Sequence, residues 1–341
     1  MATATPTRPT SRPTVRPTVR PALRSALSRR GFLAGTGGAA ATLVLAACGG
    51  GDAGGAGGAT RTVTGASGPV EIPANPQRIV CTDFYTTYAL LDVGVTPAAT
   101  AQATVGGVLP EYQQAYDAIP KVGTPTALNF EAIAAQSPDL ILGTQVPSLP
   151  ADLGAQLSGI GPTLLLPAAA NPGSWGERAL RTADAVNRLP QGEQLRASYD
   201  QHATRIREQH AATLGRTRWA LVRGSSGGGF FSDYPTSWSG VVLADAGFRF
   251  GQFAEGKTGA GGRLSYEQAP AQLEDCDVVL HLADTRGGVD ANTQTLLAQP
   301  AFQQVRAVRE GRLFPLPNYY CSHYKQGDAV QSYLETIVPR V

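Results

Sequence analysis

The sequence predicts an α/β fold made of two Rossmann-like lobes, which are joined by a long rigid α-helix and enclose a ligand cleft between them. From about residue 70 onward, short and nearly continuous apolar runs alternate with helical patterns, which is typical of a mostly parallel sheet buried on both faces. One long amphipathic pattern, at 191–213, lies between two α/β halves of similar size, 68–190 and 214–341. The length of 341 residues suffices for two ordinary domains.

Six apolar runs are expected to be strands, at 78–82, 139–144, 162–166, 219–224, 278–283 and 313–316. Two helix starts have recognisable caps: Asn129 precedes a helix that begins at Phe130, and Ser265 with Gln268 makes a capping-box pattern. In the long pattern at 191–213, one apolar stripe recurs at spacings of four and three, through Leu195, Tyr199, Ala203 and Ile206.

The composition supports a packed globular core, with 42% apolar and 16% charged residues. Seven of the 28 basic residues precede the first acidic residue, Asp52, so the rest of the chain is net acidic despite the overall charge of +2. A folded part without a basic surplus argues against a nucleic-acid partner. The four cysteines show neither zinc spacing nor a disulfide framework: Cys48, Cys81, Cys276 and Cys321.

Residues 1–47 have the organisation of an export signal, with a charged region, a short apolar stretch and a processing site. The pair Arg29-Arg30 resembles a twin-arginine signal, the alternative being a chance pair in an arginine-rich leader. The tetrapeptide LAAC that ends at Cys48 resembles the lipobox of bacterial lipoproteins, in which the cysteine thiol is lipidated. The Gly-rich stretch 48–67 is expected to be a flexible tether.

Candidate ligand contacts follow from the rule that ligands of two-lobed α/β proteins bind outside the carboxyl ends of the strands. Aromatic rings with a few cations suit a bulky, oxygen-rich chelate, because arginine donates in a fork and tyrosine and tryptophan offer rigid area with one polar group. For the aromatic run at 318–325, the alternative is packing of the last strand against the terminal helix. The candidates are Tyr85, Thr144, Arg223, Tyr234, Trp238, Arg263, Tyr319, Tyr320, His323 and Tyr324.

Several short motifs occur in a characteristic order: PQRIV at 76–80, YALLDVGVTP at 88–97, VG at 122–123, NFEAIAAQSPDLIL at 129–142, LADAGF at 243–248, LSYEQ at 264–268 and AVREGR at 307–312. Over roughly residues 68–341 this order resembles the ABC-importer binding proteins with a helical backbone, the group that carries ferric siderophores, haem and cobalamin. In that family one exposed glutamate on each lobe docks onto arginines of the membrane permease. The matching positions are Glu131 and Glu267, although the helix dipole alone also favours a carboxylate there.

The resemblance implies an extracytoplasmic, lipid-anchored solute-binding protein that captures a ferric siderophore and delivers it to an ABC permease. It implies a monomer on the outer face of the cytoplasmic membrane, without catalytic residues and without a cofactor of its own. A hydroxamate ligand is preferred, because few cations are present to offset a highly anionic catecholate.

Three other functions are weighed against a siderophore carrier. A haem or cobalamin carrier has the same fold, and His323 or a tyrosine would then be an axial haem ligand. A bare metal site is not expected, because two of the four histidines, His202 and His210, lie on the linking helix. An exported enzyme is the third alternative, but the GSSG sequence at 224–227 does not match the nucleophile pattern G-x-S-x-G.

Overall fold

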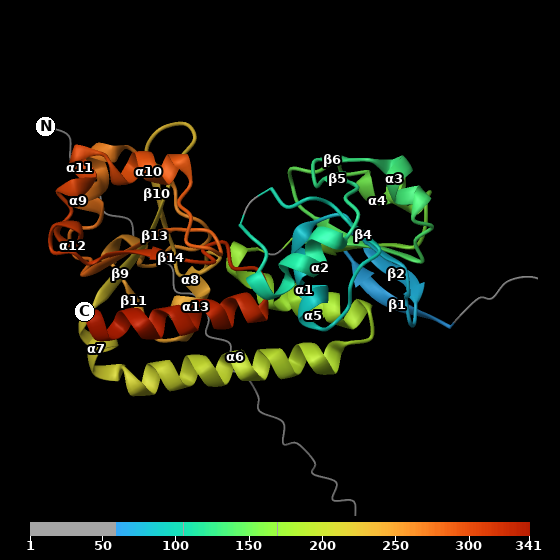
Figure 1. The fold of residues 1–341 in the computed structure, drawn as a ribbon, viewed down its shortest axis with the longest axis horizontal. Coiled ribbons are helices and arrows are strands. Elements are labelled where there is room, and N and C mark those ends of the chain that lie inside the picture. The colour runs from blue at the N-terminus through green and yellow to red at the C-terminus, as the bar shows by residue number, and fades with distance from the viewer. Residues whose placement is uncertain (1–58, 105, 169) are drawn as a thin grey trace, which may run out of the picture. The chain divides into compact units, whose positions relative to one another are not determined.

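The computed structural model describes residues 59–104, 106–168 and 170–341. The expected export signal with Arg29 and Arg30, the expected lipidation site Cys48 and the first part of the tether lie outside these residues. Within them, two separate sheets are covered by helices, and one long helix runs beneath both (Figure 1). No helix in this part of the chain combines the length and the apolar character needed to cross a bilayer.

The described chain begins with a hairpin that the sequence did not predict. Strand β1 (Thr60–Gly65) pairs antiparallel with β2 (Gly68–Pro73), and Gly68 takes the positive φ of 114° that the turn requires. Val63 and Val70 pack against the core of the first lobe. The expectation of a flexible tether as far as residue 67 is therefore wrong from Thr60 onward, because alternate threonine and valine side chains give this segment one face to bury.

The first lobe is built on a four-stranded parallel sheet in the order β4-β3-β7-β8. Alternate residues of the central strand β7 enter different cores: Leu140 and Leu142 pack on one face, and Ile141 packs on the other. Both faces are thus apolar, as the uninterrupted hydrophobic run predicts. The strands are β3 (Ile79–Cys81), β4 (Ala99–Thr100), β7 (Leu140–Gln145) and β8 (Thr163–Pro167).

Short helices and a small hairpin cover this sheet. Asn129 caps α3, since its side chain accepts a hydrogen bond from the Ala132 amide at 3.0 Å, as the sequence predicts. The elements are α1 (Phe84–Asp92), η1 (Pro110–Tyr112), α2 (Gln113–Ala118), β5 (Gly123–Thr124), β6 (Ala127–Leu128), α3 (Phe130–Ala135), α4 (Leu153–Ser158), η2 (Pro172–Ser174) and α5 (Trp175–Ala185).

The second lobe has a mixed sheet in the order β12-β10-β9-β13-β14, with β11 paired to the start of β9. Strands β9, β11, β13 and β14 are parallel, and β10 and β12 are antiparallel additions. The strands are β9 (Arg218–Gly224), β10 (Phe230–Asp233), β11 (Arg249–Phe250), β12 (Arg263–Leu264), β13 (Val278–Leu282) and β14 (Leu313–Leu316). All six predicted strands are thus present, and each of their ends lies within one residue of the predicted end.

The helices of the second lobe begin at well-defined caps. The capping box forms as predicted, since the Ser265 amide donates to Oε1 of Gln268 at 2.8 Å. The elements are α7 (Ala211–Arg216), α8 (Gly240–Asp245), η3 (Gln252–Ala254), η4 (Tyr266–Gln268), α9 (Ala269–Gln272), α10 (Ala291–Leu297), α11 (Pro300–Gln303), α12 (Arg306–Arg309), α13 (Tyr324–Ile337) and η5 (Val338–Arg340).

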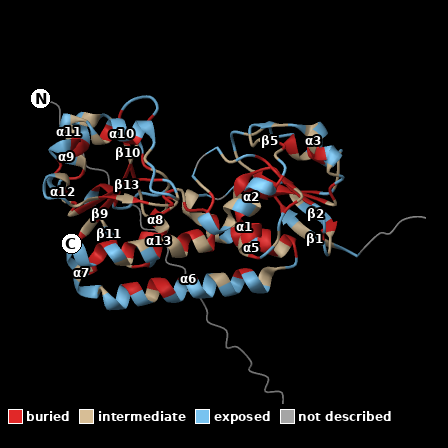
Figure 2. Cartoon of the chain, in the orientation of Figure 1, coloured by how far each residue is buried: buried red, intermediate tan, exposed pale blue. Residues whose placement is uncertain are grey.

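The long helix is α6 (Leu189–Gln209), which packs against α5 and α13. It begins two residues before the predicted start and ends at Gln209 rather than Thr213, because His210 leaves the helical conformation before α7 begins. The predicted stripe is buried at Tyr199, Ala203 and Ile206. Figure 2 shows the buried residues concentrated in the two sheets, with α6 largely exposed along its outer side.

An aromatic cluster joins α5, α6 and α13, the three helices that connect the lobes. The Trp175, Tyr199 and Tyr324 rings meet edge to face, with centroids 5.4 to 5.9 Å apart. The Trp175 indole also donates a hydrogen bond to the Trp238 carbonyl at 3.0 Å. Trp175 belongs to the first lobe by sequence and packs in the core of the second, so α5 links the two lobes.

Candidate functional site

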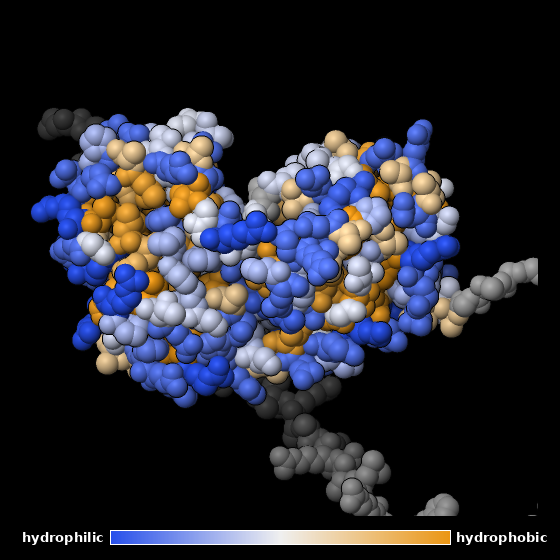
Figure 3. Space-filling view, viewed as in Figure 1, coloured by the Kyte–Doolittle hydropathy of each residue, from blue (hydrophilic) through white to orange (hydrophobic). Residues whose placement is uncertain are grey.

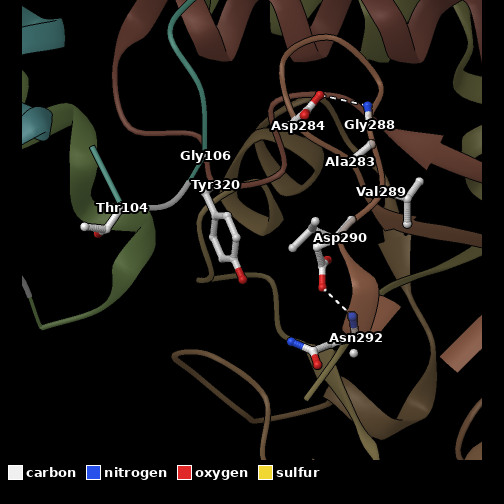
Figure 4. Close-up of a pocket in the computed structure, with 11 residues that line it drawn as sticks. Thr104, Gly106, Ala283, Asp284, Gly288, Val289, Asp290, Asn292 and Tyr320 are labelled. Carbon is white, nitrogen blue, oxygen red and sulfur yellow. Dashed lines mark hydrogen bonds between the residues drawn. The ribbon is translucent and has the colours of Figure 1, made fainter. Parts of the chain in front are cut away.

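A cavity of about 460 Å³ lies at the carboxyl ends of β9 and β13, where both lobes line it. The first lobe contributes Thr104, from the segment after β4, and the second contributes Tyr320, Asp284, Asp290 and Asn292. In Figure 4 the Tyr320 ring lies between Thr104 on one side and Asp290 and Asn292 on the other. The cavity is therefore at the edge that the sequence predicts for ligand binding.

A smaller cavity of about 170 Å³ lies in the first lobe and shares Thr104 with the larger one. Tyr85 and Thr144, both predicted as contacts, line it together with Asp83. Oδ2 of Asp83 and Oγ1 of Thr144 are buried and have no hydrogen-bond partner within the described part of the chain. Figure 3 shows a hollow between the two lobes on the upper side of the view.

Arg223 is held in place by a fully buried carboxylate. Its Nε and Nη2 donate to Asp233 at 2.9 and 3.2 Å, and the Tyr319 hydroxyl donates to the same carboxylate at 2.9 Å. Burial lowers the pKa of Arg223, but Asp233 more than offsets this and the net pKa is raised. The guanidinium also lies 4.0 Å from the Phe231 ring centre and 5.4 Å from that of Trp238. Arg223 is thus a fixed cation beside the aromatic wall of the cleft.

That wall consists of three half-buried aromatic side chains: Tyr85 and Tyr320, which line the two cavities, and Trp238, which packs against Tyr320 beside them. The Trp238 and Tyr320 rings are perpendicular, with centroids 5.0 Å apart. Burial raises the pKa of the Tyr85 phenol, while Arg178 and the Trp238 indole from the other lobe oppose the rise. Burial likewise raises the pKa of Tyr320, which Arg223 opposes. The wall presents rigid rings with neutral hydroxyl groups near two cations.

Arg178 is a cation of this site that the sequence interpretation missed. It lies in the first turn of α5, with its guanidinium carbon 4.5 Å from the Tyr85 ring centre. Burial lowers its pKa and nearby Asp83 raises it, yet its nitrogens make no hydrogen bond or ion pair within the described residues. The contacts predicted from the sequence lie in or beside loops that directly follow strands. The first turn of a helix that follows a strand also lies at the carboxyl edge of the sheet. Including the first turn of the helix after β8 among the candidate positions would have identified Arg178.

The acidic part of the large cavity was also missed. Oδ1 of Asp284 accepts hydrogen bonds from the Arg286 and Gly288 amides, both at 2.8 Å. Asp290 caps α10 by accepting from the Asn292 and Thr293 amides. Both carboxylates thus have a structural role in the loop after β13. Because aspartate is common in turns and caps, the sequence did not indicate that these two also line the cavity.

Three predicted contacts in the run at 318–325 are buried and do not line either cavity, so only Tyr320 of this run reaches the site. Tyr319 is 1% exposed and bonded to Asp233, and Tyr324 packs in the aromatic cluster with its hydroxyl 3.3 Å from the Gly176 carbonyl. His323 is fully buried and donates from Nδ1 to Asp92 at 2.9 Å. Packing of the last strand against the terminal helix, the alternative interpretation, accounts for these three.

Two further candidates lie near the outer edge of the second sheet rather than in the two cavities. Tyr234 contacts the Lys257 ammonium at 5.6 Å, and Arg263 is exposed with its guanidinium 3.3 Å from the Gly227 carbonyl. The two glutamates expected to dock onto a permease, Glu131 and Glu267, are both exposed in first helical turns, one on each lobe. A backbone hydrogen bond and the Ser265 hydroxyl lower the pKa of Glu267.

The described residues contain no group of three or more histidine, cysteine, aspartate or glutamate side chains placed to hold a metal ion. His281 is buried in β13, with Nδ1 3.1 Å from the Leu282 carbonyl. Among the described residues, Cys81, Cys276 and Cys321 are buried and form no disulfide, and burial raises the pKa of each thiol. The cleft therefore offers aromatic rings, hydroxyl groups, two arginines and the carboxylates of Asp284 and Asp290.

The fold and the cleft define a two-lobed α/β ligand-binding protein. The sequence profile of the family described as periplasmic binding protein matches residues 79–320, and the chain belongs to this family. Members of the family bind solutes rather than catalyse reactions.

One curated relative is the probable siderophore-binding lipoprotein YfiY of Bacillus subtilis (strain 168). It is 32% identical over 192 residues, which are 56% of this chain and 57% of the relative, so the match spans little more than half of that protein. Among solved structures, the siderophore periplasmic binding protein from the fuscachelin gene cluster of Thermobifida fusca has a TM-score of 0.70 and 26% identity, over 79% of this chain and 99% of that one. A periplasmic solute binding protein from Mycobacterium smegmatis str. MC2 155 has a TM-score of 0.69 and 25% identity, over 83% and 98%.

Proposed function

We propose that this protein captures a ferric siderophore outside the cell and delivers it to the permease of an ABC importer. The observation that carries the proposal is a cleft lined by Tyr85 from one lobe and Tyr320 from the other, with Trp238 packed against Tyr320. The cations Arg178 and Arg223 lie beside these rings. Rigid rings contact the organic shell of a chelate, and guanidinium groups donate to its oxygens. The names of the relatives point to the same class of ligand.

The charge of the cleft favours a hydroxamate ligand over a highly anionic catecholate. Arg223 is already neutralised by Asp233, and Asp284 and Asp290 add negative charge to the larger cavity. Arg178 is the one cleft arginine that lacks an ion pair within the described residues. In a ferric trihydroxamate complex, the three hydroxamate charges neutralise the iron. Such a complex suits a cleft with only one arginine that lacks an ion pair within the described residues.

A haem carrier is less well supported. His323, which together with a tyrosine was an expected axial ligand, is fully buried and bonded to Asp92, and His281 is buried in a strand. Neither histidine lines either of the two cavities.

Intrinsic fluorescence gives a direct test, because Trp175 and Trp219 are at most 2% exposed, whereas Trp238 is half-buried and packs against the cleft residue Tyr320. Titration with a ferric trihydroxamate, a ferric tris-catecholate, haem and cobalamin should show quenching by the hydroxamate complex at the lowest concentration. Trp238→Phe should remove most of the quenching. Binding of haem alone, with a Soret band, would contradict the proposal.

Two substitutions test the contacts. Tyr320→Ala and Arg178→Ala remove a cleft ring and a cation without breaking an ion pair within the described residues, so each should raise the Kd of the ferric hydroxamate about tenfold, or ~1.4 kcal/mol. Arg263→Ala, on the outer edge of the sheet, is the control and should leave the Kd unchanged. If both cleft variants bind the ferric hydroxamate with unchanged affinity, the assignment of the ligand site to this cleft is wrong.

Delivery to the permease would depend on export by the signal at 1–47, on membrane attachment through a lipid at Cys48, and on the lobes 68–190 and 214–341, which carry the docking residues. Glu131 and Glu267 would contact the permease, mainly setting orientation and on-rate, since single exposed ion pairs contribute only ~0–1 kcal/mol. Cys48→Ser should move the protein from the membrane fraction to the medium. Glu131→Ala with Glu267→Ala should reduce siderophore uptake by cells while leaving the Kd of the purified protein unchanged.

A further inference from the structure

Asp92, the last residue of α1 in the first lobe, has a carboxylate that accepts hydrogen bonds from the second lobe. Its side chain is 2% exposed. Its Oδ1 is 2.9 Å from Nδ1 of His323, and its Oδ2 accepts from the Lys325 amide at 3.2 Å. Because a carboxylate only accepts, Nδ1 of His323 must carry the proton. A buried carboxylate without such donors would be costly, so these bonds hold the two lobes together at this point.

Both sides of this junction are firmly supported. In the first lobe, the Tyr112 hydroxyl donates to Oδ1 of Asp92 at 3.0 Å. In the second lobe, the His323 side chain is 1% exposed and flanked by the rings of Tyr88 and Tyr112, with centroids 5.7 and 6.4 Å away. The Ser322 amide donates to Oε1 of Gln326 at 3.0 Å, which fixes the segment that presents the histidine.

The junction is connected to the ligand cleft through short, rigid segments. Helix α1 carries Asp92 at its end and Tyr85 near its start, about 10 Å apart along the helix axis at 1.5 Å per residue. In the other lobe, Tyr320 precedes His323 by three residues in the same loop. The junction therefore shares a helix with one cleft aromatic, Tyr85, and a loop with the other, Tyr320.

We propose that Asp92 and His323 are positioning residues that fix the angle between the lobes, and hence the separation of Tyr85 and Tyr320, independently of the covalent link through α6. The inference goes beyond the proposed function and rests on it only for the measurement of affinity.

The test compares two disruptive variants, Asp92→Ala and His323→Leu, with a conservative one, His323→Asn, whose side-chain amide can still donate to the carboxylate. Glu111→Gln is the control, since Glu111 lies in the same region and makes an exposed ion pair with the Lys325 ammonium at 3.1 Å, but does not contact Asp92 or His323 within the described residues. Hydrogen exchange without added siderophore should accelerate about tenfold or more at the Lys325 amide in both disruptive variants. Amides of β9 and β13 should exchange as in the wild type.

The same variants are then titrated with the ferric trihydroxamate. The disruptive variants should raise its Kd about tenfold, mainly through faster dissociation, while His323→Asn and Glu111→Gln stay within about twofold of the wild type. An unchanged exchange rate at the Lys325 amide would overturn the inference. Equal acceleration of exchange throughout β9 and β13 would also overturn it, because that result indicates a general loss of stability. If no variant and no wild-type protein binds siderophore, the proposed function fails and the exchange data still decide the inference.

Discussion

At the scale of single residues, Asp233 is a buried carboxylate that accepts hydrogen bonds from three different residues of the second lobe. It is fully buried and accepts from Arg223, from Tyr319 and from the Gly261 amide at 3.0 Å. Asp233→Asn would leave the Arg223 guanidinium, with a side chain 12% exposed, without its counter-ion, which we expect to cost about 3 kcal/mol of unfolding free energy. Urea denaturation of the wild type and the Asp233→Asn variant measures this loss of unfolding free energy. Glu177→Gln, which breaks the exposed pair with Arg181, should cost about 0.5 kcal/mol or less, and equal losses would contradict the assignment.

His281 makes the unfolding free energy depend on pH. Burial lowers its pKa below the usual 6.5, which the hydrogen bond to the Leu282 carbonyl only partly offsets. As the pH falls below about 6.5, the unfolded state binds the proton more readily than the native state, so stability falls. Unfolding free energies at several pH values between about 5 and 7 should decline less steeply for His281→Gln than for the wild type. Identical slopes would show that His281 contributes nothing to this dependence.

At the scale of elements, two helical glycines make a matched pair. A Cβ at Gly327 in α13 would lie 2.9 Å from the Tyr199 ring and 3.0 Å from the Trp175 ring, whereas a Cβ at Gly215 in α7 would meet nothing within 4 Å. Gly327→Ala should therefore destabilise the protein by about 1–2 kcal/mol, despite the better helix propensity of alanine. Gly215→Ala should stabilise it by up to about 1 kcal/mol. Thermal unfolding of both variants checks this, and a gain at both positions would refute the close packing of α5, α6 and α13.

At the scale of the whole folded part, helices α5, α6 and α13 connect two sheets that have separate cores. A continuous helix and an aromatic cluster resist bending more than extended linkers do. We therefore expect the radius of gyration from X-ray scattering to change only slightly when the ferric siderophore binds. A large decrease on binding would indicate hinge closure about flexible linkers and would contradict a rigid connection.

Much of the fold was predictable because buried parallel strands are recognisable by composition alone, as at 139–144 and 278–283. Asn129 and Ser265 were equally clear, since caps act within one turn. The orientation of side chains in the loop at 318–325 was not predictable, because no periodicity relates neighbours there. Tyr319 and Tyr320 are adjacent in sequence, yet one is bonded to Asp233 in the core and the other lines the cleft.

The hydrogen bond from the Trp175 indole to the Trp238 carbonyl has a consequence for protein engineering. The loop that presents Trp238 to the cleft belongs to the second lobe, but its support comes from a helix encoded before the linking helix. A hybrid receptor that takes residues 214–341 from a relative with another ligand would separate that loop from its support. Recombination between such receptors should preserve specificity only when the crossover point is moved upstream of Trp175.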